Sequence, residues 1–194
     1  MVFKIPSSKS EFWRLGISEN YVMIDSDSFF IRDFYKSDFM YDDSTPFTIV
    51  HEQKELFSWS ALNKQRLGFD PHISFREDKL KIMDILGIEN KHVLYDGGPP
   101  PCIWSSKVWR DLDENYIKPN KTTFYNLIKH CPSEIGWYIN SLLAFNSIPI
   151  IPREPLFKFY HYQQQFEDSI KIGETTDILK ENYIGMVIQS NWAL

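Results

Sequence analysis

The sequence has 194 residues, a length that fits one domain and suffices to bury a sizeable core. Its hydrophobic fraction of 43% is ordinary for a globular protein and excludes a disordered chain. A formal net charge of -5 argues against a general nucleic-acid binder, which needs a basic face. The aromatic fraction of 16% is high, which suits stacking on sugars and bases but suits a bulky core equally well.

The sequence also bears on the compartment in which the protein works. No stretch approaches the apolar length of a membrane-spanning helix, and the start lacks the apolar core of a signal peptide. Cys102 and Cys131 are the only cysteines, and they lack the CxxC spacing of a metal site. We therefore expect a reduced, cytoplasmic protein, for which a peripheral contact with a membrane stays open.

The first predicted elements are a short helix and a strand. The helix is expected at residues 11–19, with Ser10 as its N-cap and with Phe12 and Leu15 turned inward. The strand is expected at residues 21–24, where the continuous apolar character is typical of a parallel strand buried on both faces.

Two carboxylates, Asp25 and Asp27, stand one residue apart directly after this strand. In open α/β sheets, ligands bind beyond the carboxyl ends of the strands, and carboxylate oxygens are the ligands that Mg²⁺ or Mn²⁺ prefers. Two carboxylates so close repel each other unless a cation or a proton intervenes. The pattern predicts a metal site that holds the phosphates of a substrate. The alternative is an acidic turn, because Asp and Ser favour turns through local hydrogen bonds.

The rest of the chain alternates between predicted strands, helices and loops. Strands are expected at residues 46–50, 92–95, 148–151 and 156–162. Helices are expected at residues 77–86, 106–112, 121–129 and from residue 134 onward, with a partly helical stretch at 51–67 and an amphipathic tail from 166. The clearest loop is at residues 96–101. Together these elements predict one α/β domain over residues 1–194.

The order of these features resembles a GT-A glycosyltransferase, within a group of bacterial and phage sugar-transferase-like domains. The resemblance covers nearly the whole chain and rests on MIDSDSFF at residues 23–30, DGGPP at 96–100 leading to Trp104 and Ser105, SEIGWY at 133–138, and the late His161. It implies a GT-A-like (Rossmann-like) mixed sheet flanked by helices. It also implies a metal-dependent enzyme that moves a sugar from a nucleotide-diphosphate donor to a glycan or lipid-linked acceptor, in the synthesis of polysaccharide or lipopolysaccharide.

The resemblance implies a metal site at the acidic pair. Asp25 and Asp27 would bind the Mn²⁺ or Mg²⁺ ion that bridges the donor phosphates, with Asp25 alternatively reaching the ribose or the sugar of the donor. Such a cation neutralises the charge that builds on the leaving diphosphate. His161 sits where a late histidine often completes the metal shell in this superfamily, although a lone histidine between two tyrosines is more often structural.

The same resemblance implies a catalytic carboxylate. Glu134 is the candidate for the base that deprotonates the acceptor hydroxyl, or for a residue that grips the sugar. The alternative is an acidic residue that simply favours the first turn of a helix. The N–H groups of that turn would lower its pKa and make it a weaker base.

The loop at residues 96–101 is expected to form a wall of the donor-sugar or acceptor site. Asp96, Gly97 and Gly98 begin it, and glycines permit a close approach of the backbone while prolines hold a loop stiff. Trp104 could stack on a sugar ring or belong to the core. Arg14 could contact a phosphate or remain a solvated side chain.

One departure from the resemblance shapes the expected function. Only 24 residues precede Asp25, where the resemblance implies strands and helices that bind the nucleotide base. We therefore expect an N-terminally shortened domain, either part of a longer chain or a relative that has lost donor binding. The alternative function is an inactive sugar-transferase-like domain that binds a glycan or a protein. A haloacid-dehalogenase-type phosphatase fits less well, because Phe29 stands where that family has Thr or Val.

Overall fold

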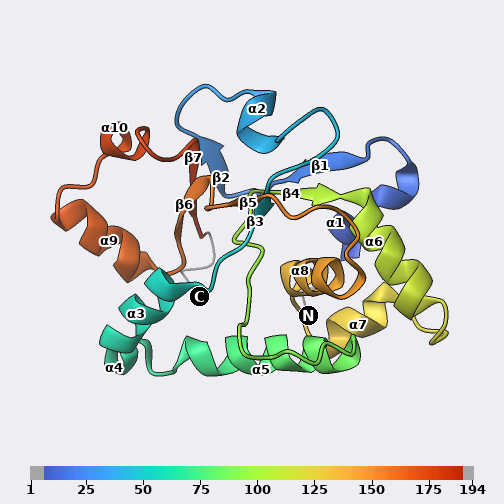
Figure 1. Ribbon diagram of the computed structural model, residues 1–194. Coiled ribbons are helices and arrows are strands. Elements are labelled where there is room, and N and C mark those ends of the chain that lie inside the picture. Colours follow the sequence, from blue (N-terminus) through green and yellow to red (C-terminus); the bar gives the residue numbers. More distant parts are fainter. Residues whose placement is uncertain (1–6, 190–194) are drawn as a thin grey trace.

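The computed structural model describes residues 7–189, which form an α/β protein with three small sheets (Figure 1). The helical elements are α1 (Ser7–Ser10), the 3₁₀ helix η1 (Phe12–Leu15), α2 (Lys36–Phe39), α3 (Lys54–Leu62), α4 (Lys64–Leu67), α5 (Pro71–Ile85), α6 (Ser106–Leu112), the π-helical turn η2 (Asp113–Ile117), α7 (Phe124–His130), α8 (Glu134–Phe145), α9 (Gln163–Lys171) and α10 (Thr176–Leu179). The strands are β1 (Asn20–Met23), β2 (Ser28–Phe30), β3 (Thr48–Ile49), β4 (Cys102–Ser105), β5 (Pro152–Arg153), β6 (Phe157–Tyr160) and β7 (Gly185–Ile188).

The strands pair across long stretches of sequence. β1 pairs antiparallel with β4, and β3 pairs in parallel with β5. β7 lies between β2, which is antiparallel to it, and β6, which is parallel to it. In Figure 1 the strands gather in the upper middle, α5 runs along the lower edge beneath α8, and α3 and α9 lie on the left. The predicted α/β class is confirmed, while the described strands form separate small sheets and not one large one.

The strand predicted at residues 21–24 forms, but its surroundings differ from the prediction. β1 is antiparallel to its partner, with Met23 opposite Cys102. Met23 is 5% exposed, whereas Val22 and Ile24 are 36% and 42% exposed, so alternate side chains face the core and the surface. The prediction of a parallel strand buried on both faces is therefore wrong. A short apolar run does not distinguish the two arrangements.

The predicted helices along the second half of the chain are confirmed, and their caps explain where they begin and end. At the start of α8, the Ser133 hydroxyl accepts a hydrogen bond from the N–H of Gly136 at 3.0 Å. Thr123 caps α7 in the same way. Gly87, with φ at 70°, follows the end of α5, as the sequence predicts.

Three other predicted elements are wrong. Residues 148–151 form no strand, and the strand in this part of the chain is β5 at Pro152–Arg153. The helix expected at residues 11–19 is only the short η1, because Gly16 adopts φ of 64° and ends it, and Leu15 is 65% exposed. Residues 92–95 form no strand. Instead, the next residue, Asp96, makes an isolated antiparallel bridge with His51.

The main core lies between the β1–β4 pair and the helices α5 to α8. Its largest fully buried side chains include Trp104, Trp109 and Trp137. Both cysteines are buried and free. Among residues 7–189, no helix has the length and apolar character needed to cross a membrane. β1, β4 and α8 all contribute buried side chains to the main core, which fixes their positions. Two of the predicted site residues lie at their ends, Asp25 after β1 and Glu134 at the start of α8.

Candidate functional site

The structure brings two of the predicted site residues together in a polar cluster, which we call the acidic corner: Lys9, Ser10, Asp25 and Glu134. Asp25 follows β1, and Glu134 is the first residue of α8. Lys9 of α1 forms an ion pair with Asp25, and the hydroxyl and backbone N–H of Ser10 donate to Glu134. The charges of Lys9 and Asp25 both act on Glu134, so the four residues form one electrostatic unit.

The Glu134 carboxyl has an altered acidity. Burial raises its pKa above the ordinary value, and the charge of Asp25 adds to the rise. The hydrogen bonds from Ser10 and the charge of Lys9 act in the opposite direction and are outweighed. The prediction that the helix N-terminus lowers this pKa is therefore wrong, because the loss of water around the carboxyl exceeds the effect of the donors. Glu134 Oε1 is buried and has no hydrogen-bond partner among the described residues.

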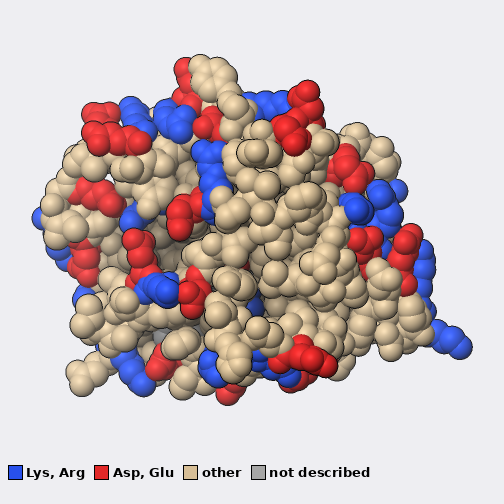
Figure 2. Space-filling view, viewed as in Figure 1, with Lys and Arg blue, Asp and Glu red and all other residues tan. Residues whose placement is uncertain are grey.

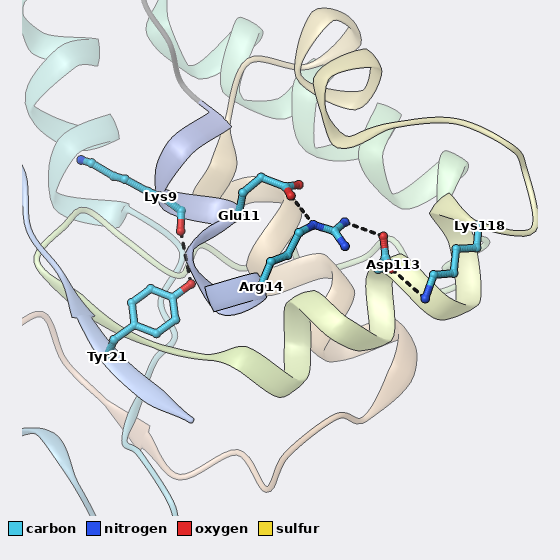
Figure 3. A network of polar contacts seen from close by, with 6 residues as sticks. All are labelled: Lys9, Glu11, Arg14, Tyr21, Asp113 and Lys118. Atoms are coloured by element: carbon cyan, nitrogen blue, oxygen red, sulfur yellow. Dashed lines mark hydrogen bonds and ion pairs between the residues drawn. The ribbon is translucent and has the colours of Figure 1, made fainter. Parts of the chain in front are cut away.

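The segment that carries Lys9 is fastened to β1 and to the end of α6 (Figure 3). The Tyr21 hydroxyl donates to the Lys9 carbonyl at 3.3 Å. Arg14 pairs with Glu11 and donates to the Asp113 carboxylate at 2.7 Å. Burial opposes ionisation of Asp113, but Arg14 and then Lys118 outweigh it and hold the pKa of Asp113 below its usual range. In this structure Arg14 is thus engaged in joining η1 to η2.

The other residues of the predicted metal site, Asp27 and His161, are not among the described groups that act on Glu134. Asp27 is in the loop between β1 and β2, where its carbonyl accepts from the N–H of Ile188 at 3.3 Å. His161 follows β6 and lies in the electrostatic field of Asp96. No three His, Cys, Asp or Glu side chains of the described residues are grouped so as to hold a metal ion. As placed, Asp25, Asp27 and His161 do not fit a Mn²⁺ or Mg²⁺ site, and the Lys9 ammonium is the cation that faces Asp25.

A second polar region surrounds His161, and we call it the histidine cleft: His51, Gln53, Lys79, Asp96 and His161. Two adjoining cavities of about 780 and 330 Å³ meet there, and Gln53 and His161 line both. The larger is bounded by the start of α3, β6 and the start of α9, and the smaller by α5 and the start of α8. Figure 2 shows this face hollowed left of its centre, with acidic and basic side chains interspersed around the hollow.

Asp96 holds the wall of this cleft together. Its backbone N–H donates to the His51 carbonyl at 2.7 Å, and its carboxylate accepts from Lys79 Nζ at 2.8 Å and from Gln53 Nε2 at 2.6 Å. Burial opposes its ionisation, but Lys79 and Gln53 outweigh that cost and place the pKa of Asp96 below its ordinary value. Asp96 is therefore an ionised residue whose oxygens are bound by protein groups and tie the loop to α3 and α5.

The two glycines after Asp96 give the close approach that the sequence suggests, but it is to protein. A Cβ at Gly97 would lie 3.1 Å from Ile139 Cβ, and one at Gly98 would lie 2.8 Å from Ile135 Cδ1. Both isoleucines belong to α8, so the absence of side chains at the two glycines lets the loop pack closely against this helix. The Gly98 carbonyl also contacts His51 Nε2.

Trp104 lies in the core, which is the alternative to sugar stacking. Its side chain is 0% exposed, and its ring stacks on Tyr138 with the ring centroids 5.4 Å apart. Trp109 packs edge-on against it at 5.0 Å. Neighbouring rings therefore occupy the positions that a sugar would need.

His161 is the titratable group at the junction of the two cavities. Burial lowers its pKa to about 4, the nearby His51 adds to the lowering, and Asp96 opposes it. The imidazole is therefore neutral near pH 7 and has one nitrogen that donates and one that accepts. Its backbone N–H donates to Gln165 Oε1 at 3.0 Å, which ties it to α9.

Sequence reasoning does not identify His51, Gln53 or Lys79 as site residues. His51 directly follows the predicted strand at residues 46–50, which is the one signal available for it. Lys79 has no signal, because a lysine in a helix is most often solvated. Here it is 4% exposed.

Comparison of the chain with known protein families, with curated proteins and with solved structures finds no match. The resemblance to GT-A glycosyltransferases therefore rests on the sequence stretches alone and stays a prediction. The structure adds the effect of the Asp25 charge on Glu134 and the cleft at His161.

Proposed function

We propose that this protein is a glycosyltransferase-type domain that transfers a sugar from a nucleotide-diphosphate donor to a glycan or lipid-linked acceptor. The observation that carries the proposal is that Asp25 and Glu134, which come from separate motifs, belong to one acidic corner in which the charge of Asp25 acts on Glu134. The acceptor hydroxyl must lose a proton as it attacks the sugar. A carboxylate whose pKa is raised above its ordinary value is a stronger base for that proton than a fully solvated one.

Glu134 is the proposed base. The Ser10 donors hold its carboxyl group, while Oε1, which has no partner among the described residues, is the atom proposed to accept the proton once the acceptor displaces the groups that bury it. The negative charge of Asp25 favours the protonated form that results. This proton transfer needs no metal ion, and no step is assigned to one because the residues as placed do not fit a metal.

Calorimetric titration of UDP, with and without Mn²⁺, tests donor binding. We expect UDP to bind. If a cation does join Asp27 to the donor, binding requires Mn²⁺ and Asp27→Ala weakens it about tenfold or more, the loss of at least one strong contact. Asp33→Ala, in the same region but exposed, is the matched control and should leave the affinity unchanged. Absence of UDP binding with and without Mn²⁺ would contradict the proposal that this chain uses such a donor.

A second candidate function, an inactive sugar-transferase-like domain that binds a glycan or a protein, is favoured by the Lys9–Asp25 ion pair. Lys9 already neutralises a carboxylate that the cation of a donor would use. The Lys9→Met variant separates the two functions in the same titration. A gain of Mn²⁺-dependent UDP binding supports the transferase, whereas no UDP binding in either protein supports the binding module.

A further inference from the structure

The histidine cleft is large enough for a small-molecule ligand. Its two cavities, about 780 and 330 Å³, fall within the range of roughly 300–1,000 Å³ that such ligands usually occupy. Because His161 lines both, a ligand that extends from one cavity into the other can contact its imidazole. Tyr95 and Tyr183 line the larger cavity and offer ring surface together with a hydroxyl.

Several polar groups that line the cleft carry no charge. Gln165 and Asn182 line the larger cavity together with His161, whose imidazole is neutral near pH 7. Each amide side chain has both donor and acceptor atoms, and so does the neutral imidazole. Hydroxyl groups also donate and accept, so this set of side chains matches a ligand that carries several hydroxyls.

The charges around the cleft do not favour an anion. Glu55 and Glu154 line the larger cavity, and both act on the nearby Tyr183, but neither forms an ion pair within residues 7–189. Every lysine that lines the two cavities is held by a carboxylate, in the pairs Lys79–Asp96 (2.8 Å), Lys54–Glu52 (2.7 Å) and Lys158–Glu174 (3.9 Å). Asp78 lines the smaller cavity and likewise forms no ion pair within residues 7–189. An entering phosphate or carboxylate would therefore meet compensated cations and three uncompensated carboxylates.

We propose that the histidine cleft binds an uncharged carbohydrate and discriminates against anionic sugars and nucleotides. The hydroxyls of the sugar exchange hydrogen bonds with His161, Gln165 and Asn182, and its ring packs near Tyr95 and Tyr183. The proposal rests on the proposed function in one respect, since the bound sugar would be the acceptor. Its test, however, needs neither a donor nor a metal.

The experiment is a glycan array that carries neutral and acidic oligosaccharides, probed with the labelled full chain in metal-free buffer. We expect binding to neutral glycans. The affinity for the best neutral glycan should fall about tenfold in His161→Phe and in Asn182→Ala, the equivalent of one lost hydrogen bond in each. Asn182 is exposed, so its variant keeps the test valid if His161→Phe does not fold. Asn115→Ala, an exposed asparagine in η2, is the matched control and should bind as the wild type does.

Charge reversal tests the discrimination against anions. The double variant Glu55→Lys with Glu154→Lys alters two exposed side chains and should gain binding to acidic glycans. Glu114→Lys, exposed in η2, should gain none.

Three results would overturn the proposal: no glycan bound, binding to acidic glycans alone, or neutral binding that His161→Phe and Asn182→Ala both leave unchanged in folded protein. Because Asp25, Asp27 and Glu134 take no part in this test, its outcome is independent of the UDP titration. Failure of one therefore leaves the other standing.

Discussion

The acidic corner and the histidine cleft each remove a carboxyl group from water, but they compensate it differently. In the cleft, Lys79 and Gln53 outweigh the cost of burying Asp96, and the pKa of Asp96 falls. In the corner, the Ser10 donors and Lys9 do not outweigh the cost of burying Glu134, and its pKa rises. A fully compensated carboxylate stays ionised and joins the elements around it, whereas an incompletely compensated one holds its proton to a higher pH than usual.

Removal of Lys79 should cause the largest loss of stability, because it takes away the cation that compensates the buried Asp96. Lys79→Met leaves the buried charge of Asp96 without its ion-pair partner, and we expect a loss of about 3–5 kcal/mol in the free energy of unfolding. Urea denaturation at pH 7 measures it. Lys81→Met, an exposed lysine on the same helix, should change stability by less than about 0.5 kcal/mol. A loss below about 1 kcal/mol for Lys79→Met would contradict the account of the cleft.

The neutral imidazole of His161 should make stability depend on pH. Its pKa is about 4 in the folded protein and 6.5 when unperturbed. The neutral His161 therefore makes its full contribution to the free energy of unfolding above pH 6.5. As the pH falls toward 4, the unfolded chain takes up a proton that the folded protein refuses, and up to about 3 kcal/mol is lost. Urea unfolding at pH 7, 5.5 and 4.5 should show a smaller loss for His161→Phe than for the wild type. Equal losses would contradict the burial of a neutral His161.

The raised pKa of Glu134 predicts an effect of the opposite sign. The raised pKa contributes to stability below the ordinary pKa of 4.5, and this contribution is lost as the pH rises through the pKa of the folded protein. At pH 7 the ionised Glu134 therefore lowers the free energy of unfolding. We expect Glu134→Gln to stabilise the protein at pH 7 by roughly 1 kcal/mol, and the gain should vanish at pH 3.5. Glu114→Gln, which is exposed, provides the control in thermal unfolding. Destabilisation by Glu134→Gln at pH 7 would show that the charge is fully compensated.

The Lys9–Asp25 ion pair should contribute least to stability. The two side chains are 38% and 30% exposed, so solvent screens the pair and Lys9→Met should cost less than about 1 kcal/mol. The cost should shrink further in 0.5 M salt, measured by urea denaturation. A loss above about 2 kcal/mol would show that this pair stabilises the protein as the buried Lys79–Asp96 pair does. It would contradict the stated difference between the acidic corner and the histidine cleft.

The sequence predicts the parts of this molecule that depend on local signals. The caps of α7 and α8, the glycine after α5 and the loop at Asp96 all follow from neighbouring residues. No local pattern indicates that the charge of Asp25 acts on Glu134, because the two residues are far apart in the sequence.

The remainder depends on tertiary packing, which a sequence pattern does not contain. The apolar run at residues 21–24 predicts a strand that is buried on both faces, although one face lies at the surface. Lys79 reads as a solvated helical lysine, and only the fold places Asp96 beside it. Glu134 has helix donors that argue for a lowered pKa, and burial reverses the direction. The resemblance implies that His161 is a metal ligand, and packing places it instead in the electrostatic field of Asp96 and His51.

The most direct test of the acidic corner is a ¹³C NMR titration of the Glu134 carboxyl in the wild type and in Asp25→Asn. We predict a pKa above the ordinary 4.5 in the wild type and a lower value in the variant, because the variant removes the charge that favours the protonated form. A wild-type pKa at or below 4.5, or one that Asp25→Asn leaves unchanged, would contradict the proposal that Asp25 and Glu134 form one site.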